Sequence, residues 1–276
     1  MSTRRAIFWS VFWIVLSLLL NGAVFLLYGH QKAAAFFTGY IIEKSLSVDN
    51  LFVFLMIFTF FDVSSVHQRR ILNYGIIGVI ILRGLLIFAG ASLVERFEWI
   101  FYIFGAILIY SGYTMAFGKE RRVEPEHNLI LKLFKKFIPV KNAYTGDHFF
   151  LKEEGVLYAT PMIVVLIVIE TTDVIFAIDS IPAIFGITTD PFIVFSSNLM
   201  AVLGLRSLYF VLERVQRAFV YVKYGVGVVL SFIGVKMLIA DYAEISTLTS
   251  LAVVVSILTA SVLLSYIKRA VTGTMN

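Results

Sequence analysis

Residues 160–184, TPMIVVLIVIETTDVIFAIDSIPAI, form an apolar stretch that is long enough to cross a bilayer but contains Glu170, Asp173 and Asp179. A membrane-spanning helix needs about 20 apolar residues. A charged side chain at the centre of a bilayer costs on the order of 3 kcal/mol even on the lenient insertion scale, and such residues are functional by default. These acids are therefore the first candidates for a functional site.

The composition of the whole chain is that of a membrane protein. Of 276 residues, 59% are hydrophobic and only 15% are charged, and the mean hydropathy is +0.90. Soluble domains carry about 25% charged residues. The chain contains no cysteine, which excludes disulfides, thiolate metal sites and thiol redox chemistry. We expect an all-α polytopic membrane protein, and nothing in the sequence indicates a nucleic-acid partner.

Hydropathy predicts about eight transmembrane helices, so the lipid bilayer is the first expected partner. The spans are expected near residues 7–29, 36–61, 71–94, 97–117, 160–184, 191–212, 219–240 and 246–267. Lys and Arg accumulate in every second loop, and basic loops lie on the cytoplasmic side. Both termini are therefore expected in the cytoplasm.

An internal repeat relates the two halves of the chain. Asp49-Asn-Leu-Phe52 matches Asp173-Val-Ile-Phe176 at an offset of 124, and Leu82-Arg83 matches Leu205-Arg206 at an offset of 123. At an offset of 122, Tyr102, Gly105, Gly112 and Met115 recur as Tyr224, Gly227, Gly234 and Met237. Each half contains three spans, so the second half must be inverted. Inverted repeats are typical of transporters whose site lies at mid-membrane, whereas a duplicated scaffold without a site is the weaker alternative.

These observations divide the chain into five parts. Residues 1–35 hold a first transmembrane helix and 36–117 the first repeat. Residues 118–159 form a cytoplasmic linker, 160–240 the inverted second repeat, and 241–276 a last transmembrane helix with a cytoplasmic tail. The linker is the only substantial segment outside the spans.

The linker contains a predicted amphipathic basic helix. Leu129, Leu133, Phe134 and Phe137 fall on one helical face, and Lys132, Lys135 and Lys136 lie on or beside the other. This pattern suits a helix on an anionic inner leaflet. A solvated linker with an apolar contact to the bundle is an equal alternative.

The buried acids can converge only in part on continuous helices. Glu170 and Asp173 are one turn apart, but Glu43 lies six residues before Asp49, and Asp179 six after Asp173, about 120° around a helix. All five acids meet only if these helices are unwound or if the faces of several helices contribute. Pro161 and Pro182 bracket the second acidic span and are candidate positions for a break in its helix. Carboxylates together with neutral oxygens such as that of Asn50 suit hard divalent ions, Mg²⁺, Ca²⁺ or Mn²⁺. All four histidines fall in expected loops, which disfavours zinc and copper, and no catalytic constellation is present, so an enzyme is not expected.

Two arginines, Arg83 and Arg206, accompany the acids inside the apolar stretches. They are expected to pair with carboxylates, either as structural counter-charges or as groups that a cation releases when it binds. The structural role is the favoured alternative, because buried charges are generally paired. Lys44 is a further candidate partner for Glu43.

Several motifs resemble those of the TerC/Alx family of bacterial membrane proteins. They are Glu43-Lys-Ser-Leu-Ser-Val-Asp-Asn50, Glu170-Thr-Thr-Asp173, Phe176-Ala-Ile-Asp-Ser-Ile-Pro182, Thr188-Thr-Asp-Pro191 and Leu205-Arg-Ser-Leu208. Members of that family are associated with manganese export and tellurium resistance. The resemblance implies a bacterial cytoplasmic-membrane protein and metal-site positions at Glu43, Asp49, Asn50, Glu170, Asp173 and Asp179. It also selects Mn²⁺ among the hard ions, with Ca²⁺ and Mg²⁺ less favoured.

We therefore expect an exporter of divalent cations, with Mn²⁺ as its substrate and proton antiport as a hypothesis. The alternative is a non-transporting membrane partner in metal or tellurite resistance or in secretion, for which the linker would be the docking surface. Transport of tellurite itself is disfavoured, because an anion would face five acids and only two arginines. The sequence leaves the oligomeric state open.

Overall fold

The computed structural model of the protein describes residues 3–118, 128–141, 146, 148–153, 155–215 and 221–273, with the side chains of residues 3, 49, 212–215 and 269–273 outside the description. Helices make up most of it, as expected. They are α1 (Thr3–Tyr28), α2 (His30–Phe60), α3 (Ser65–Arg96), α4 (Ile100–Phe117), α5 (Leu129–Phe137), α6 (Pro161–Phe185), α7 (Pro191–Leu203), α8 (Leu205–Val215), α9 (Val222–Leu238) and α10 (Thr247–Gly273).

Helices occupy all eight segments that hydropathy predicts to be spans, and six of them are long and apolar enough to cross a membrane. These six are α1, α3, α4, α6, α7 together with α8, and α10. Helix α2 differs because Glu43, Lys44 and Asp49 interrupt its apolar sequence, and α9 has only 17 residues. Multiple apolar helices are thus present, and six is the number of candidate spans in the described chain.

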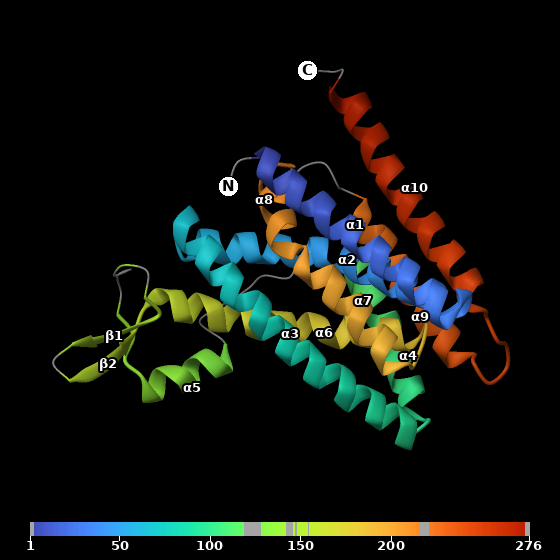
Figure 1. Ribbon diagram of the computed structural model, residues 1–276, viewed down its shortest axis with the longest axis horizontal. Helices are drawn as coiled ribbons and strands as arrows, with labels where there is room; N and C mark the ends of the chain where they lie inside the picture. Colours follow the sequence, from blue (N-terminus) through green and yellow to red (C-terminus); the bar gives the residue numbers. More distant parts are fainter. Residues whose placement is uncertain are drawn as a thin grey trace.

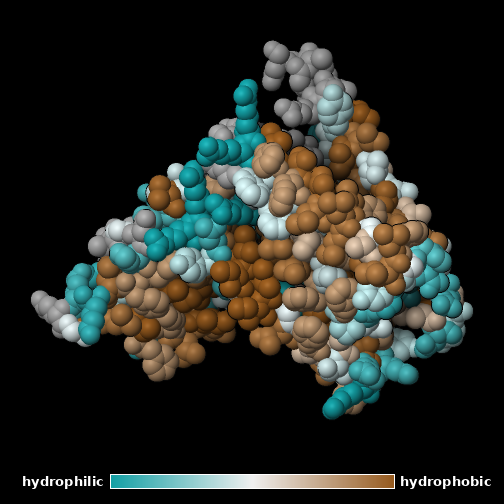
Figure 2. Space-filling model, viewed as in Figure 1, coloured by the Kyte–Doolittle hydropathy of each residue, from teal (hydrophilic) through white to brown (hydrophobic). Residues whose placement is uncertain are grey.

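The helices run roughly side by side and form one bundle (Figure 1). Helices α6 and α7 are the most buried of the candidate spans, whereas α1 and α10 expose most of their apolar side chains. On the face shown in Figure 2, hydrophobic side chains form a broad band between hydrophilic groups at the upper left and lower right. Such a large exposed apolar surface requires a lipid environment.

Prolines and short polar side chains define where several helices begin. Pro161 and Pro191 occupy the first turns of α6 and α7, where a missing N–H costs nothing. Asp190 caps α7 by accepting hydrogen bonds from the backbone N–H groups of Phe192 and Ile193 at 3.0 and 3.4 Å. Pro182, a candidate position for a break, does not interrupt α6: the helix is continuous, because this proline lies in its last turn.

The break lies instead between α7 and α8, at Gly204. Lys44 of α2 reaches this point, and its Nζ donates a hydrogen bond to the carbonyl oxygen of Ala201 at 3.1 Å. Ala201 is in the last turn of α7, where carbonyl groups have no partner within the helix and a positive charge is favourable. A Cβ at position 204 would lie 2.6 Å from Lys44 Nζ, so glycine provides the space for this contact.

Helices α4 and α9 pack closely through paired glycines. A Cβ added to Gly227 would lie 2.7 Å from the carbonyl oxygen of Gly112, and one added to Gly234 would lie 2.6 Å from that of Gly105. The two backbones are therefore in direct contact, as is common where small residues line transmembrane helix pairs.

The linker contains more structure than the sequence indicated. Helix α5 is present, but strands β1 (Phe150–Glu153) and β2 (Val156–Ala159) also form an antiparallel hairpin, so the all-α expectation is wrong for this segment. The strands are only four residues long, which leaves little periodicity to detect. Figure 1 shows the hairpin and α5 together at one end of the bundle.

Candidate functional site

Arg83 lies at the centre of a buried cluster of polar side chains where α2, α3, α6 and α7 meet. Its Nε and Nη2 donate hydrogen bonds to Oδ2 and Oδ1 of Asp173 at 2.8 and 2.9 Å. Its Nη1 donates to Glu43 Oε1 and, at 3.4 Å, to Asn198 Oδ1. Asn198 in turn donates from Nδ2 to Glu43 Oε2 at 2.9 Å. We call these four residues the acid–arginine cluster.

The acid–arginine cluster is almost completely dry. The exposed fractions of Glu43, Arg83, Asp173 and Asn198 are 0%, 1%, 1% and 2%. A buried guanidinium is tolerated only when carboxylates and hydrogen bonds compensate for its lost hydration, and its planar fork suits two-point binding to Asp173. Two carboxylates share one guanidinium, so the fully ionised cluster carries one net negative charge. That charge attracts a proton or a cation.

Glu170 lies one turn before Asp173 on α6, but its carboxylate makes no hydrogen bond within the described residues, although both oxygens are buried. It rests against glycines of α3. A Cβ added at Gly78 would lie 2.6 Å from Glu170 Cδ, and one at Gly75 would lie 3.6 Å from Oε1. The glycines thus make room for an acid that has no protein donor, and a buried acid in this state calls for a proton or a cation.

Further polar groups lie beyond the cluster along α6 and α2. Ser111 of α4 donates a hydrogen bond to Asp179 Oδ1 at 2.6 Å, about 9 Å along α6 from Asp173. Ser180 Oγ and Asn50 Nδ2 are buried without a hydrogen-bond partner among the described residues. Polar atoms therefore continue along the inside of the bundle on both sides of Asp173.

The structure brings together only some of the predicted metal-site residues. Glu43 and Asp173 are joined through Arg83, whereas Glu170 and Asp179 lie in separate surroundings. The side chain of Asp49 lies outside the described residues. Among the side chains that are described, no three His, Asp or Glu residues are grouped so as to hold a metal ion.

The predicted cations occupy different positions. Arg83 is the counter-charge of two acids, while Arg206 Nε is buried without a hydrogen-bond partner in the described part of the chain. Lys44 donates to the backbone of α7 instead of to Glu43. Sequence reasoning missed Asn198, although an amide inside an apolar span is a recognisable signal for interhelical hydrogen bonding.

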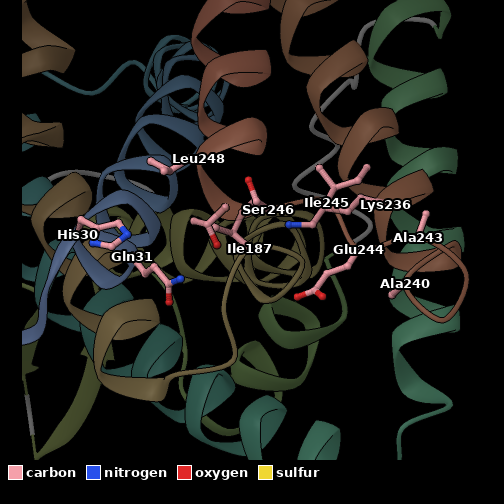
Figure 3. Close-up of a pocket in the computed structure, with 11 residues that line it drawn as sticks. His30, Gln31, Ile187, Lys236, Ala240, Ala243, Glu244, Ile245, Ser246 and Leu248 are labelled. Atoms are coloured by element: carbon pink, nitrogen blue, oxygen red, sulfur yellow. The ribbon is translucent and has the colours of Figure 1, made fainter.

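A separate cavity of about 350 Å³ lies at the N-terminal end of α2 (Figure 3). Its polar lining includes His30, Gln31, Lys236 and Glu244, and Lys236 Nζ donates to Ser250 Oγ at 3.0 Å. His30 is about 20 Å along α2 from Glu43, so the cavity does not contain the acid–arginine cluster. It is a mixed-charge recess at the rim of the bundle.

The fold and the acid–arginine cluster define an integral membrane protein whose apolar helices enclose charged side chains. The model of the family described as "Integral membrane protein TerC family" matches residues 28–272, and the chain belongs to this family.

Relatives extend over most of the chain. It is 48% identical to Alx of Escherichia coli (strain K12) over 267 residues, covering 94% of this chain and 83% of Alx. It is 46% identical to Alx of Salmonella typhi over 96% of this chain and 85% of that protein. The thylakoid membrane protein TERC of Arabidopsis thaliana is 45% identical over 88% of this chain and 63% of its own length. No solved structure matches the chain significantly.

Proposed function

We propose that the protein exports a divalent cation, Mn²⁺, across the bacterial cytoplasmic membrane, and that it acts as a transporter and not as an enzyme. The observation that carries this proposal is the acid–arginine cluster, in which Glu43 and Asp173 share one guanidinium in a dry environment. A net negative charge at this depth is costly unless a mobile cation or proton visits it.

In the absence of substrate, the guanidinium of Arg83 would occupy the position of the cation. While Arg83 is bound to both acids, no cation can reach their oxygens. A divalent cation that enters the cluster would displace the guanidinium and take over the carboxylates, with Glu170 as an additional acid that has no competing donor. The full proposed ligand set is Glu43, Asp49, Asn50, Glu170, Asp173 and Asp179, with Arg83 and Arg206 as charge-pairing groups.

Protons would leave as the cation binds. Metal ligands must be deprotonated, so any of these acids that is protonated in the empty protein releases its proton on metal binding. Exchange of Mn²⁺ for protons follows from this competition. The oxygen-only ligand set supports a hard ion, and the family's association with manganese favours Mn²⁺ over Ca²⁺ and Mg²⁺.

The glycine contacts between α4 and α9 support the proposed inverted repeat. Gly105 and Gly112 of α4 correspond in sequence to Gly227 and Gly234 of α9. In space, Gly112 contacts Gly227, which is the counterpart of Gly105. Gly105 contacts Gly234, which is the counterpart of Gly112. A two-fold axis between the helices would produce this exchange. We accordingly propose eight spans, including α2 and α9, with both termini cytoplasmic.

The test is uptake of radioactive Mn²⁺ into inside-out proteoliposomes under an imposed pH gradient. Glu43→Gln and Asp173→Asn are expected to abolish saturable uptake, whereas Asp190→Asn, at the surface, should retain it. Uptake at the same rate without a pH gradient would reject proton coupling. No uptake by folded wild-type protein would reject transport.

If folded wild-type protein takes up no Mn²⁺, the alternative role as a partner protein is favoured, because the linker forms a structured surface at one end of the bundle. The provisional name of the bacterial relatives describes them as membrane-bound redox modulators. This chain contains no cysteine, so it cannot contribute a thiol to such a process. Deletion of residues 118–155 separates the two roles, because a partner protein should lose its function, whereas an exporter should lose mainly regulation or assembly.

A further inference from the structure

Helix α5 and the β1–β2 hairpin are fixed to the end of the bundle. Leu131 of α5 is 3% exposed and packs in the same core cluster as residues of α6. The ring of Phe149 meets that of Tyr74 edge to face at 5.0 Å. His67 Nε2 lies 3.2 Å from the carbonyl oxygen of Gly146. Leu131 therefore fixes one side of α5 against the bundle, and the contacts of Phe149 and Gly146 fix the segment that leads into the hairpin.

A face of α5 that carries large apolar side chains is not covered by the protein. Leu129, Ile130, Leu133 and Phe137 are 79%, 55%, 57% and 77% exposed. With 100° between successive residues, these four fall within an arc of about 100°, whose centre is about 150° from Leu131. The apolar face therefore points away from the bundle.

Lysines border this face. Lys132, Lys135 and Lys136 are all exposed and occupy the arc between the apolar face and Leu131, and α5 contains no acidic residue. In Figure 2 the hydrophobic side chains at the lower left, over α5, adjoin the apolar band of the bundle. The apolar face is thus continuous with the surface that meets lipid.

We propose that α5 is a recognition surface for anionic phospholipids of the membrane in which the protein resides. Its apolar face enters the boundary between head groups and acyl chains, and its three lysines bind lipid phosphate groups. Polybasic segments beside a membrane attract anionic lipids, whereas a free solvent-facing helix would not expose four large apolar side chains on nine residues. This inference does not depend on the transport function.

The absence of cysteine from the chain allows a direct test by site-directed spin labelling. Single labels at Leu133→Cys and Phe137→Cys are placed in the full-length protein in nanodiscs of phosphatidylcholine with 25% phosphatidylglycerol. We expect both labels to collide more with oxygen than with a water-soluble nickel reagent. A label at Glu153→Cys, on the exposed hairpin, should show the opposite ratio. Labels at Leu133→Cys and Phe137→Cys that face water would overturn the proposal.

Two comparisons separate recognition of anionic lipid from simple apolar contact. The depth of the Leu133→Cys label should decrease in discs of phosphatidylcholine alone, and also in the Lys132→Gln/Lys135→Gln/Lys136→Gln variant. A control variant with equal loss of charge elsewhere, Lys32→Gln/Arg96→Gln/Lys152→Gln, should leave the depth unchanged. Salt at 1 M should mimic the lysine variant, because the screening length falls to about 3 Å. Equal depth in both lipids would reject binding of anionic lipid.

Discussion

Arg83 donates hydrogen bonds to both carboxylate oxygens of Asp173, at 2.8 and 2.9 Å, and each of the two side chains is only 1% exposed. This pair ties α3 to α6 inside the bundle. Through Glu43 and Asn198 the same guanidinium also reaches α2 and α7. One guanidinium therefore connects α3 to three other helices.

Replacing the arginine alone should be strongly destabilising. Arg83→Met leaves Glu43 and Asp173 buried without a counter-charge, and breaking a buried ion pair in this way costs about 3–5 kcal/mol. We expect a large fall in the melting temperature of the protein in detergent. Arg96→Met, at an exposed position at the end of α3, is the matched control and should remain close to wild type.

Neutralising the whole acid–arginine cluster should restore stability without restoring transport. Buried ion pairs are often replaced by uncharged residues with little loss, because the desolvation cost disappears together with the attraction. The variant Glu43→Gln/Arg83→Met/Asp173→Asn is therefore expected to melt at a higher temperature than Arg83→Met alone. Its Mn²⁺ uptake should be absent. A triple variant that transports Mn²⁺ would place the substrate path elsewhere.

Much of the fold can be predicted from the sequence because apolar length and charge are local properties. The stretches around Arg83 and Asp173 are long and apolar enough to predict helices, and the family motifs are specific. The pairing of Arg83 with two acids could not be predicted in this way, because it depends on the rotation of four helices about their axes. No pattern within a single span determines that rotation.

Other differences also have physical causes. Pro182 is a candidate helix breaker by sequence, but its position in the last turn of α6 removes few backbone hydrogen bonds. The break that does occur is at Gly204, where the absence of a side chain leaves room for Lys44 from a distant helix. Asn198 could have been singled out from the sequence alone, since an amide in an apolar helix requires a partner.

The glycines beside Glu170 yield a prediction about substrate affinity. In Gly78→Ala the new methyl group would lie 2.6 Å from Glu170 Cδ, so the carboxylate must move. Alanine is about 1 kcal/mol better than glycine in a helix, and a flexible side chain can shift, so we expect little loss of stability. The KM for Mn²⁺ uptake should rise. Gly75→Ala, with its nearest contact at 3.6 Å, is the matched control and should keep the wild-type KM.

The contact between α4 and α9 should not tolerate a methyl group. In Gly227→Ala the Cβ would lie 2.7 Å from the carbonyl oxygen of Gly112, which is backbone and cannot move without separating the helices. Overpacking of this kind typically costs about 1–3 kcal/mol, which a lower melting temperature would show. Gly22→Ala in α1 has no neighbour within 4 Å and should be neutral or slightly stabilising. Equal melting temperatures for the two variants would contradict the close contact.

Lys44 should stabilise the end of α7. Lys44→Met removes the ammonium group that donates to the carbonyl oxygen of Ala201, and hydrogen bonds that involve a charged group contribute about 1.5–3 kcal/mol. Part of this loss of stability is offset because a methionine side chain is easier to bury than the ammonium group of lysine. We expect a lower melting temperature than for Lys32→Met, which loses an exposed ion pair worth at most about 1 kcal/mol.

The ion pair between Lys32 and Asp190, at 2.6 Å, should make stability depend on pH. Partial burial alone would raise the pKa of Asp190, but hydrogen bonds from Lys32 and from the backbone N–H groups of Ile193 and Phe192 outweigh it and lower the pKa. The stabilisation is therefore present above the unfolded-state pKa of about 4 and is lost as the pH falls through the lower folded-state value.

Asp190→Asn isolates this charge effect, because asparagine caps a helix as well as aspartate does. We expect the variant to melt at a lower temperature than wild type at pH 7, by a small margin because both partners are partly exposed. The difference should shrink as the pH falls below about 4, where the carboxylate becomes protonated first in the unfolded chain and then, at lower pH, in the folded protein. Equal melting temperatures of the variant and the wild type at pH 7 would mean that the helix cap, and not the ion pair with Lys32, is what Asp190 contributes.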